Sequence, residues 1–136
     1  MGKITGFLLV LLLFSACGKE TSQVPNVAVN LTGFFTPGQL SELKSKGAIF
    51  MNGGVAGIII AYNPFENGYK AYDRCSTVNP EKRCAVVLEN SVTLTDPCTG
   101  AKYSLLDGTP SKAPAKVALR TYNILVSANN NFQVTN

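Results

Sequence analysis

The sequence predicts an all-β fold, a small sandwich or barrel of antiparallel strands with one short helix near residues 37–46. Short runs of alternating apolar and polar residues recur along the chain, separated by turn-forming Gly, Pro, Asn and Asp. Only one segment carries helix signals at both of its ends. With 136 residues, the chain has the length of a single domain.

The helix is predicted from its caps. Thr36 and Gln39 have the spacing of a capping box, in which the threonine side chain accepts from first-turn amides and the glutamine reaches back to it. Pro37 suits the first helical position, because the N–H that it lacks would have no partner there. Gly47 can take the left-handed conformation that ends a helix. We therefore expect a helix over residues 37–46.

The strands before residue 73 are predicted because the spacing of apolar residues changes to a period of two. Residues 27–31 alternate, and two apolar runs at 48–51 and 55–62 are joined by Asn-Gly-Gly at 52–54, which is a hairpin signal. A long polar loop at 73–83 follows the next strand and is a candidate functional loop. The remaining strands are expected at 69–72, 84–88, 92–95, 103–106, 116–126 and 132–135.

A second candidate functional loop begins at residue 96. There an Asp-Pro turn is followed by Cys98 and Gly100, and then by the alternating Tyr103 and Leu105 of a strand. The strand ends in an Asp-Gly turn, and a Pro-bearing loop follows. The loop presents a cysteine between a carboxylate and a hydroxyl side chain.

Residues 1–16 predict a signal peptide. Lys3 supplies the positive end, and the apolar run at 7–14 is shorter than the roughly 20 residues of a membrane-spanning helix. Small residues directly before Cys17 resemble a bacterial lipoprotein signal, whose cysteine is acylated; an ordinary secretory signal is the alternative. We therefore expect an exported protein of the bacterial cell envelope, anchored to a membrane through Cys17, with a polar tether at 17–26 and one domain at 27–136.

Composition disfavours two functional classes. The basic residues are scattered rather than clustered, so a nucleic-acid partner is not expected. The chain contains no histidine, so the usual Ser–His and Cys–His catalytic pairs cannot form. Asp73, Asp96 and Asp107 each lie beside a turn residue, where a carboxylate most often accepts from backbone amides. An enzyme is therefore not favoured.

Several motifs, taken in order, resemble the Rieske iron–sulfur family. G-G-V-x-G-I-I-I-x-Y at 53–62 and Y-x-A-Y-D-R-C at 69–75 look like the paired strands that enter its first cluster loop. D-P-C-T-G at 96–100 stands where the family has Cys-Pro-x-His-Gly, and the D-G turn at 107–108 and A-P-A at 113–115 follow as they do there. The resemblance spans nearly the whole predicted domain. It implies Rieske-like stacked antiparallel sheets, as in a group of exported bacterial lipoproteins.

The family's cofactor is not expected in this chain. A Rieske [2Fe–2S] cluster is held by two cysteines on one iron and two histidines on the other. The resemblance assigns these ligand positions to Cys75, Thr77, Asp96 and Thr99, of which only the first matches. The resemblance therefore implies a Rieske-like domain that has lost its cluster ligands.

The cysteines leave the pairing open. Beyond Cys17 there are three, an odd number for an exported protein, in which disulfides form. The family's two neighbouring loops imply a Cys75–Cys98 disulfide with Cys84 spare. A Cys84–Cys98 pair is the alternative, because both residues flank the hairpin predicted between them. A metal site of Cys75, Cys84, Cys98 and Asp96 is less favoured, because no Cys-x-x-Cys pair is present.

The expected function is that of a cell-envelope lipoprotein whose Rieske-like fold acts as a non-catalytic binding or accessory module for an unknown envelope partner. Residues 75–77 and 96–99 are its candidate contact surface. The alternative is a redox protein of the Rieske superfamily that uses its cysteines in a non-standard iron site or a cycling disulfide. A purely structural envelope protein is the third possibility.

Overall fold

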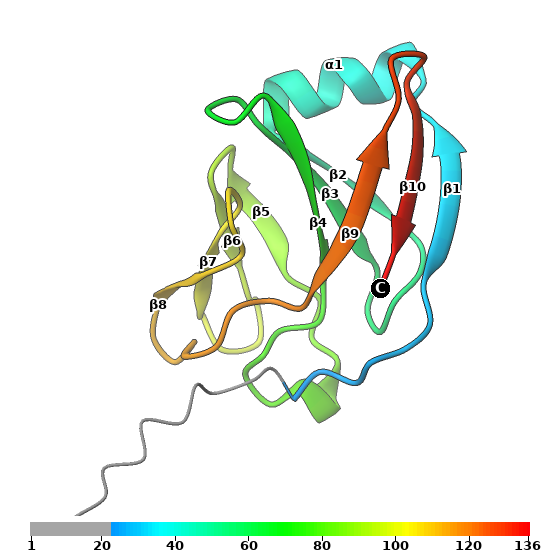
Figure 1. The fold of residues 1–136 in the computed structure, drawn as a ribbon. Coiled ribbons are helices and arrows are strands. Elements are labelled where there is room, and N and C mark those ends of the chain that lie inside the picture. The colour runs from blue at the N-terminus through cyan, green and yellow to red at the C-terminus, as the bar shows by residue number, and fades with distance from the viewer. Residues whose placement is uncertain (1–22) are drawn as a thin grey trace, which may run out of the picture.

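The computed structural model describes residues 23–136 as two antiparallel sheets and one helix (Figure 1). This arrangement confirms the predicted all-β class. The predicted signal peptide and the acylated Cys17 lie outside the described residues. Within the described part of the chain, no helix has the length and apolar character needed to cross a membrane.

The larger sheet has six strands, and every neighbouring pair in it is antiparallel. In spatial order they are β1 (Asn30–Phe34), β10 (Asn131–Thr135), β9 (Thr121–Val126), β4 (Gly68–Asp73), β3 (Ile58–Asn63) and β2 (Ala48–Met51).

The smaller sheet is inserted in the chain between β4 and β9, which are themselves neighbours in the larger sheet. Its strands, in order, are β5 (Val87–Asn90), β6 (Thr93–Thr95), β7 (Lys102–Ser104) and β8 (Pro110–Lys112). A short 3-10 helix, η1 (Pro80–Lys82), lies in the connection that leads to it. Figure 1 shows the smaller sheet to the left of the larger one.

Helix α1 (Pro37–Lys46) has the predicted caps. The Thr36 side chain accepts from the Gln39 amide at 3.2 Å, and the Gln39 side chain accepts from the Thr36 amide at 2.9 Å. Gly47 ends the helix with a φ of 89°, in the left-handed region that favours glycine. The prediction of the helix is confirmed.

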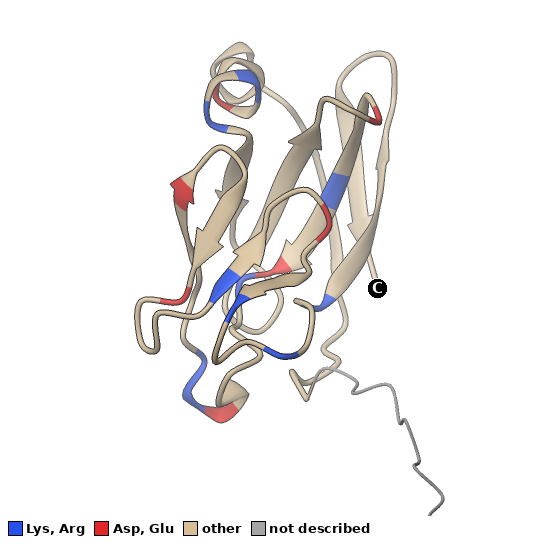
Figure 2. Ribbon diagram, turned by 90° about the vertical axis from the view of Figure 1, so that its left-hand side faces the viewer, with Lys and Arg blue, Asp and Glu red and all other residues tan. Residues whose placement is uncertain are grey.

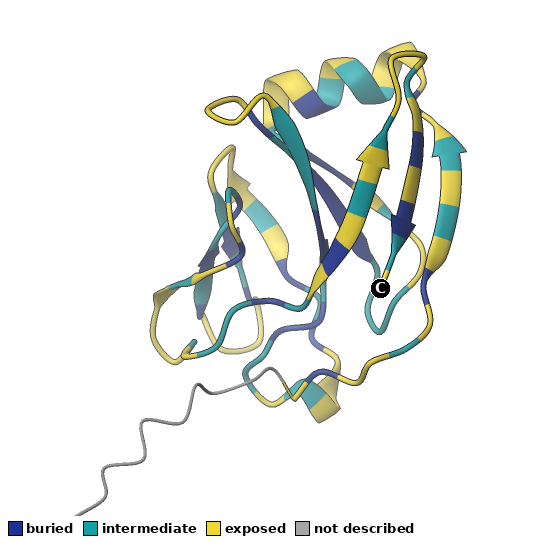
Figure 3. Cartoon of the chain, viewed as in Figure 1, coloured by how far each residue is buried: buried dark blue, intermediate teal, exposed yellow. Residues whose placement is uncertain are grey.

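Strand β3 is shared by two hydrophobic cores. Ile58 and Ile60 pack into a core with the inward side chains of β4, β9 and β10, whereas Ile59 and Ala61 face the second core beneath the smaller sheet. All four side chains are at most 1% exposed, and Figure 3 shows this strand as almost continuously buried. A strand with both faces buried lacks polar alternation, which explains its uninterrupted apolar sequence.

Some strand bounds differ from the prediction. The strand predicted at 55–62 begins only at residue 58, because 52–57 form a turn that wraps around the Asp73 carboxylate. Gly54 has a φ of 61°, and any side chain there would collide with that carboxylate. The first strand lies three residues later than predicted, and β8 was not predicted at all.

Residues before 27 also contact the domain. Val24 is 1% exposed, and its carbonyl accepts hydrogen bonds from Arg120 Nε at 3.1 Å and Nη2 at 2.7 Å. The Asn26 side chain accepts from the side-chain Nδ2 of Asn136 at 2.9 Å. The last residues of the predicted tether are therefore held against the domain.

Candidate functional site

Two loops lie side by side at the lower end of the molecule in Figure 1, and we call them the paired loops. The first, residues 74–86, connects β4 to β5, and the second, residues 96–101, connects β6 to β7. A disulfide between Cys84 and Cys98 joins them, with Cα atoms 6.4 Å apart. The sequence-predicted contact residues at 75–77 and 96–99 are therefore brought together.

The preferred Cys75–Cys98 pairing was wrong, and the alternative pairing is the one in the structure. Cys75 is still held as a continuation of β4, because it forms a β-bridge with Ala85 and its amide donates to Asp73 Oδ1 at 2.8 Å. This backbone pairing directs Cys75 into the interior, where it is a free thiol with 0% exposure. Cys84 precedes the bridge and faces the second loop.

The Asp96 carboxylate is the centre of a buried polar network. Asp96 and Ser76 are both 0% exposed. Ser76 Oγ donates to Asp96 Oδ2 at 2.6 Å, and Thr99 Oγ1 donates to the same oxygen at 2.8 Å. The other oxygen accepts from the Cys98 amide at 2.8 Å. The carboxylate thus holds its own loop in shape and binds it to the first loop.

The Tyr103 hydroxyl completes this network. It accepts from the Thr77 amide at 3.1 Å and lies 3.1 Å from Ser76 Oγ and 3.0 Å from Thr77 Oγ1. Thr77 Oγ1 donates in turn to the Val117 carbonyl at 2.7 Å. Among the described residues, no buried side-chain nitrogen or oxygen lacks a hydrogen-bond partner. The sequence placed Ser76 in the candidate contact surface and Tyr103 on a strand, but it predicted neither as part of this network. The alternation of β7 was the one sequence signal that Tyr103 faces inward.

The four cluster-ligand positions do not fit a Rieske [2Fe–2S] centre. The sequence has no histidine, and Thr77 and Thr99 offer hydroxyls that are engaged in hydrogen bonds. Asp96 offers oxygen rather than sulfur, and its carboxylate already accepts three hydrogen bonds. Only Cys75 has the required ligand chemistry, so a cluster of the Rieske type has one of its four ligands.

A different group of potential metal ligands lies nearby. One donor atom each from Cys84, Asp96 and Cys98 lie within 4.8 Å of one another. The structure therefore brings together three members of the metal site considered from the sequence, and Cys75 is not part of this group. While the disulfide is formed, neither sulfur is a thiolate, and thiolates are what zinc requires from cysteine.

The three aspartates have the structural roles predicted for them. Asp73 is 0% exposed and accepts from the amides of Val55, Ala56 and Cys75 and from the Tyr122 hydroxyl. Asp96 closes the second loop as described, and the exposed Asp107 accepts from the Thr109 amide and hydroxyl. None is left as a free carboxylate aimed at a cavity.

Burial controls the ionisation of Cys75. Desolvation, and then the negative charge of Asp73, raises the pKa of Cys75 to about 11 from an ordinary value of 9.0. The folded state therefore favours the neutral thiol. Its contribution to stability is complete below about pH 9 and is lost as the pH rises through about 11.

Raising the pH from about 8 to about 11 should therefore destabilise the wild-type protein more than its Cys75→Ala variant, by up to about 2 kcal/mol. Urea unfolding of both proteins at each pH measures the difference. Tyr72 and Tyr122, whose pKa values are also raised by burial, are present in both proteins, so their effect cancels. Equal losses in the two proteins would contradict an ionisable buried thiol.

Comparisons with known proteins bear on the fold. No family model and no curated protein matches the sequence. The structure is similar to the cyanobacterial plasma membrane Rieske protein PetC3 from Synechocystis PCC 6803, with 26% identity and a TM-score of 0.58, over 80% of this chain and 98% of that one. It is also similar in fold to a chain of the complex of reduced oxygenase and oxidized ferredoxin in carbazole 1,9a-dioxygenase, with 15% identity and a TM-score of 0.53, over 76% of this chain and 99% of that one.

The resemblance inferred from the sequence motifs is therefore confirmed at the level of the domain. The described chain is a Rieske-like domain.

Proposed function

We propose that this protein is a lipid-anchored lipoprotein of the bacterial cell envelope, whose Rieske-like domain works as a non-catalytic binding or accessory module without a cluster. The observation that carries the proposal is the hydrogen-bond network of Asp96, Ser76 and Tyr103. In this network the buried polar side chains of the paired loops bond to other protein groups. A site built to receive ligand atoms would instead present free donor atoms at these positions.

The outer side of the paired loops is available to a partner. Residues 97–100 of the second loop are exposed, as are residues 81–83 of the first. The disulfide and the network behind them hold both loops in one arrangement. A pre-organised surface loses little conformational entropy when it binds, which favours a recognition role.

A photo-crosslinking side chain at Thr99, in the full mature protein, should capture an envelope component in living cells. The matched control is the same side chain at Asn123, which is also exposed but lies on β9. Capture at residue 99 alone would support the proposal. Equal capture at both positions, or none at either, would contradict a contact surface at the paired loops.

A redox role is a second candidate because of the exposure of the disulfide. Cys98 lies on the exposed side of the second loop, whereas Cys84 is 9% exposed. A partner thiolate could attack Cys98 Sγ and form a mixed disulfide, with release of the Cys84 thiolate. A reduction potential below about −300 mV would mark the bond as structural and exclude this role. Visible absorbance of protein purified without oxygen would instead favour an iron site.

A further inference from the structure

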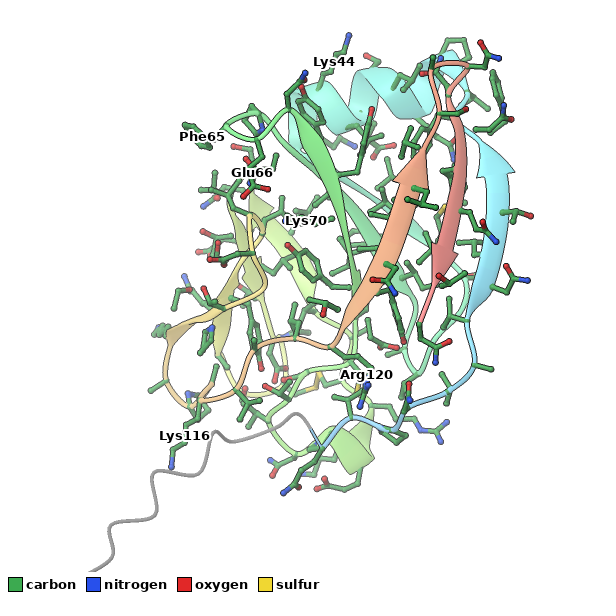
Figure 4. The ribbon with its side chains drawn as sticks, viewed as in Figure 1. Lys44, Phe65, Glu66, Lys70, Lys116 and Arg120 are labelled. Carbon is green, nitrogen blue, oxygen red and sulfur yellow. A yellow bond between two sulfur atoms is a disulfide. The ribbon has the colours of Figure 1, made fainter. Side chains whose placement is uncertain are left out.

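The end of the domain that carries the paired loops is also the end at which the N-terminal segment meets the fold. The clamp between Arg120 and the Val24 carbonyl fixes this point. In Figure 1 the described chain begins beside η1, and α1 lies at the opposite end. Figure 4 shows Lys116 and Arg120 at the first end and Lys44 on α1 at the other.

The chain between Cys17 and this clamp is short. Seven residue steps separate Cys17 from Val24, and an extended chain covers at most about 3.5 Å per residue, or about 25 Å in all. A domain of this size has a radius of gyration of about 13 Å, which corresponds to a diameter of about 34 Å. A lipid at Cys17 therefore cannot reach past the domain to place the α1 end against the membrane.

Exposed positive charge gathers at the clamped end. Lys82 ends η1 and Arg83 follows it, and Lys116 lies four residues before the clamp; all three are exposed. We call these three residues the tether-end surface. Figure 2 shows basic segments on these lower loops near the start of the described chain.

These charges are not neutralised within the domain. The ion pairs between described residues join Lys46 to Glu42, Lys70 to Glu66 and Lys102 to Glu89, and none involves the tether-end surface.

The acidic groups near the tether-end surface are few. Glu81 is the one exposed acid in the paired loops, since Asp96 is buried and fully hydrogen-bonded. The surface therefore carries a net positive charge that is open to an external anion.

We propose that the tether-end surface lies against the anionic headgroups of the membrane that holds Cys17, with Lys82, Arg83 and Lys116 next to lipid phosphates. The inference rests on the proposed lipid anchor. It names the membrane surface as a partner of the end of the domain that carries the paired loops. Each Lys or Arg near an anionic surface strengthens membrane contact by about fivefold. The short tether keeps this end of the domain close to the membrane, and the positive charges determine which face of the domain contacts it.

The test measures how close two positions of the acylated mature protein lie to lipid headgroups. Fluorophores are attached at Glu81→Cys, beside the tether-end surface, or at Ser45→Cys, on α1. Labelling is selective because Cys84 and Cys98 are oxidised and Cys75 is buried. In vesicles that contain anionic lipid and spin-labelled headgroups, we expect at least about fivefold stronger quenching at position 81 than at position 45.

Charge reversal tests the contact itself. The variant Lys82→Glu, Arg83→Glu, Lys116→Glu should lower quenching at position 81 by at least about fivefold. The control variant Lys44→Glu, Lys46→Glu, Lys70→Glu makes the same change in charge away from this surface and should leave the quenching unchanged.

The outcomes distinguish failure of the anchor from failure of the orientation. A mature protein whose mass lacks an acyl group at Cys17 would overturn the anchor and the orientation together. An acylated protein with equal quenching at positions 81 and 45 would overturn the orientation while the anchor stands. Strong quenching at 81 that survives reversal of the tether-end charges would overturn the headgroup contact. Retained disulfide and unchanged circular dichroism verify the fold of each variant.

Discussion

Replacing Asp73 with alanine should destabilise the domain by about 4 kcal/mol, the largest effect expected of any single substitution discussed. The carboxylate is fully buried and accepts from Val55 at 2.6 Å, Cys75 at 2.8 Å, the Tyr122 hydroxyl at 2.7 Å and Ala56 at 3.2 Å. Each buried donor left without a partner costs about 1–3 kcal/mol. Urea unfolding monitored by circular dichroism measures the loss.

Two further variants calibrate this result. Tyr122→Phe removes one of the four donors and should cost about 1 kcal/mol. Asp107→Ala also deletes a turn carboxylate, but Asp107 is exposed, so its loss should stay within about 1 kcal/mol. If Asp73→Ala behaved like Asp107→Ala, the buried carboxylate would not be what joins the 52–57 turn to β4 and β9.

Breaking the disulfide should lower the free energy of unfolding by about 3 kcal/mol, because the bond closes a loop between residues separated by 14 positions. The double variant Cys84→Ala, Cys98→Ala and the chemically reduced wild type should lose a similar amount. Unfolding by urea, with and without reductant, measures both.

Single cysteine variants test the pairing. Cys75→Ala should keep the sensitivity of the wild type to reductant, because Cys75 is the free thiol. Cys84→Ala should be insensitive, since it cannot form the bond. The opposite pattern would mean that Cys75, and not Cys84, is bonded to Cys98.

The fold was predictable where local chemistry determines structure. Thr36, Gln39 and Gly47 carry their own capping signals, and these signals do not depend on the rest of the chain. The strand at 55–62 was predicted to begin three residues too early. Residues 55–57 lie outside the sheet because the turn is held by Asp73, which is eighteen positions from Val55 in the sequence. Strand β8 contains Pro110 and only three residues, so it carries no alternation to detect.

The site was predictable in its positions but not in its contacts. The motifs located the residues at 75–77 and 96–99, and the structure brings them together. The pairing of the cysteines depended on which of them continues β4, which is a matter of backbone hydrogen bonding to Ala85. The role of Tyr103 depends on a hydroxyl meeting a loop 26 residues earlier, and no local pattern encodes such a distance.

The burial of both faces of β3 indicates a structural role for the smaller sheet. Without that sheet, Ile59, Ala61 and Tyr72 would face solvent. A domain with so large an exposed apolar surface would aggregate. Shielding this face requires only shape and apolar packing, and neither depends on an inorganic centre at the loops. The insertion between β4 and β9 therefore has a packing role of its own, whether or not the paired loops hold a cofactor.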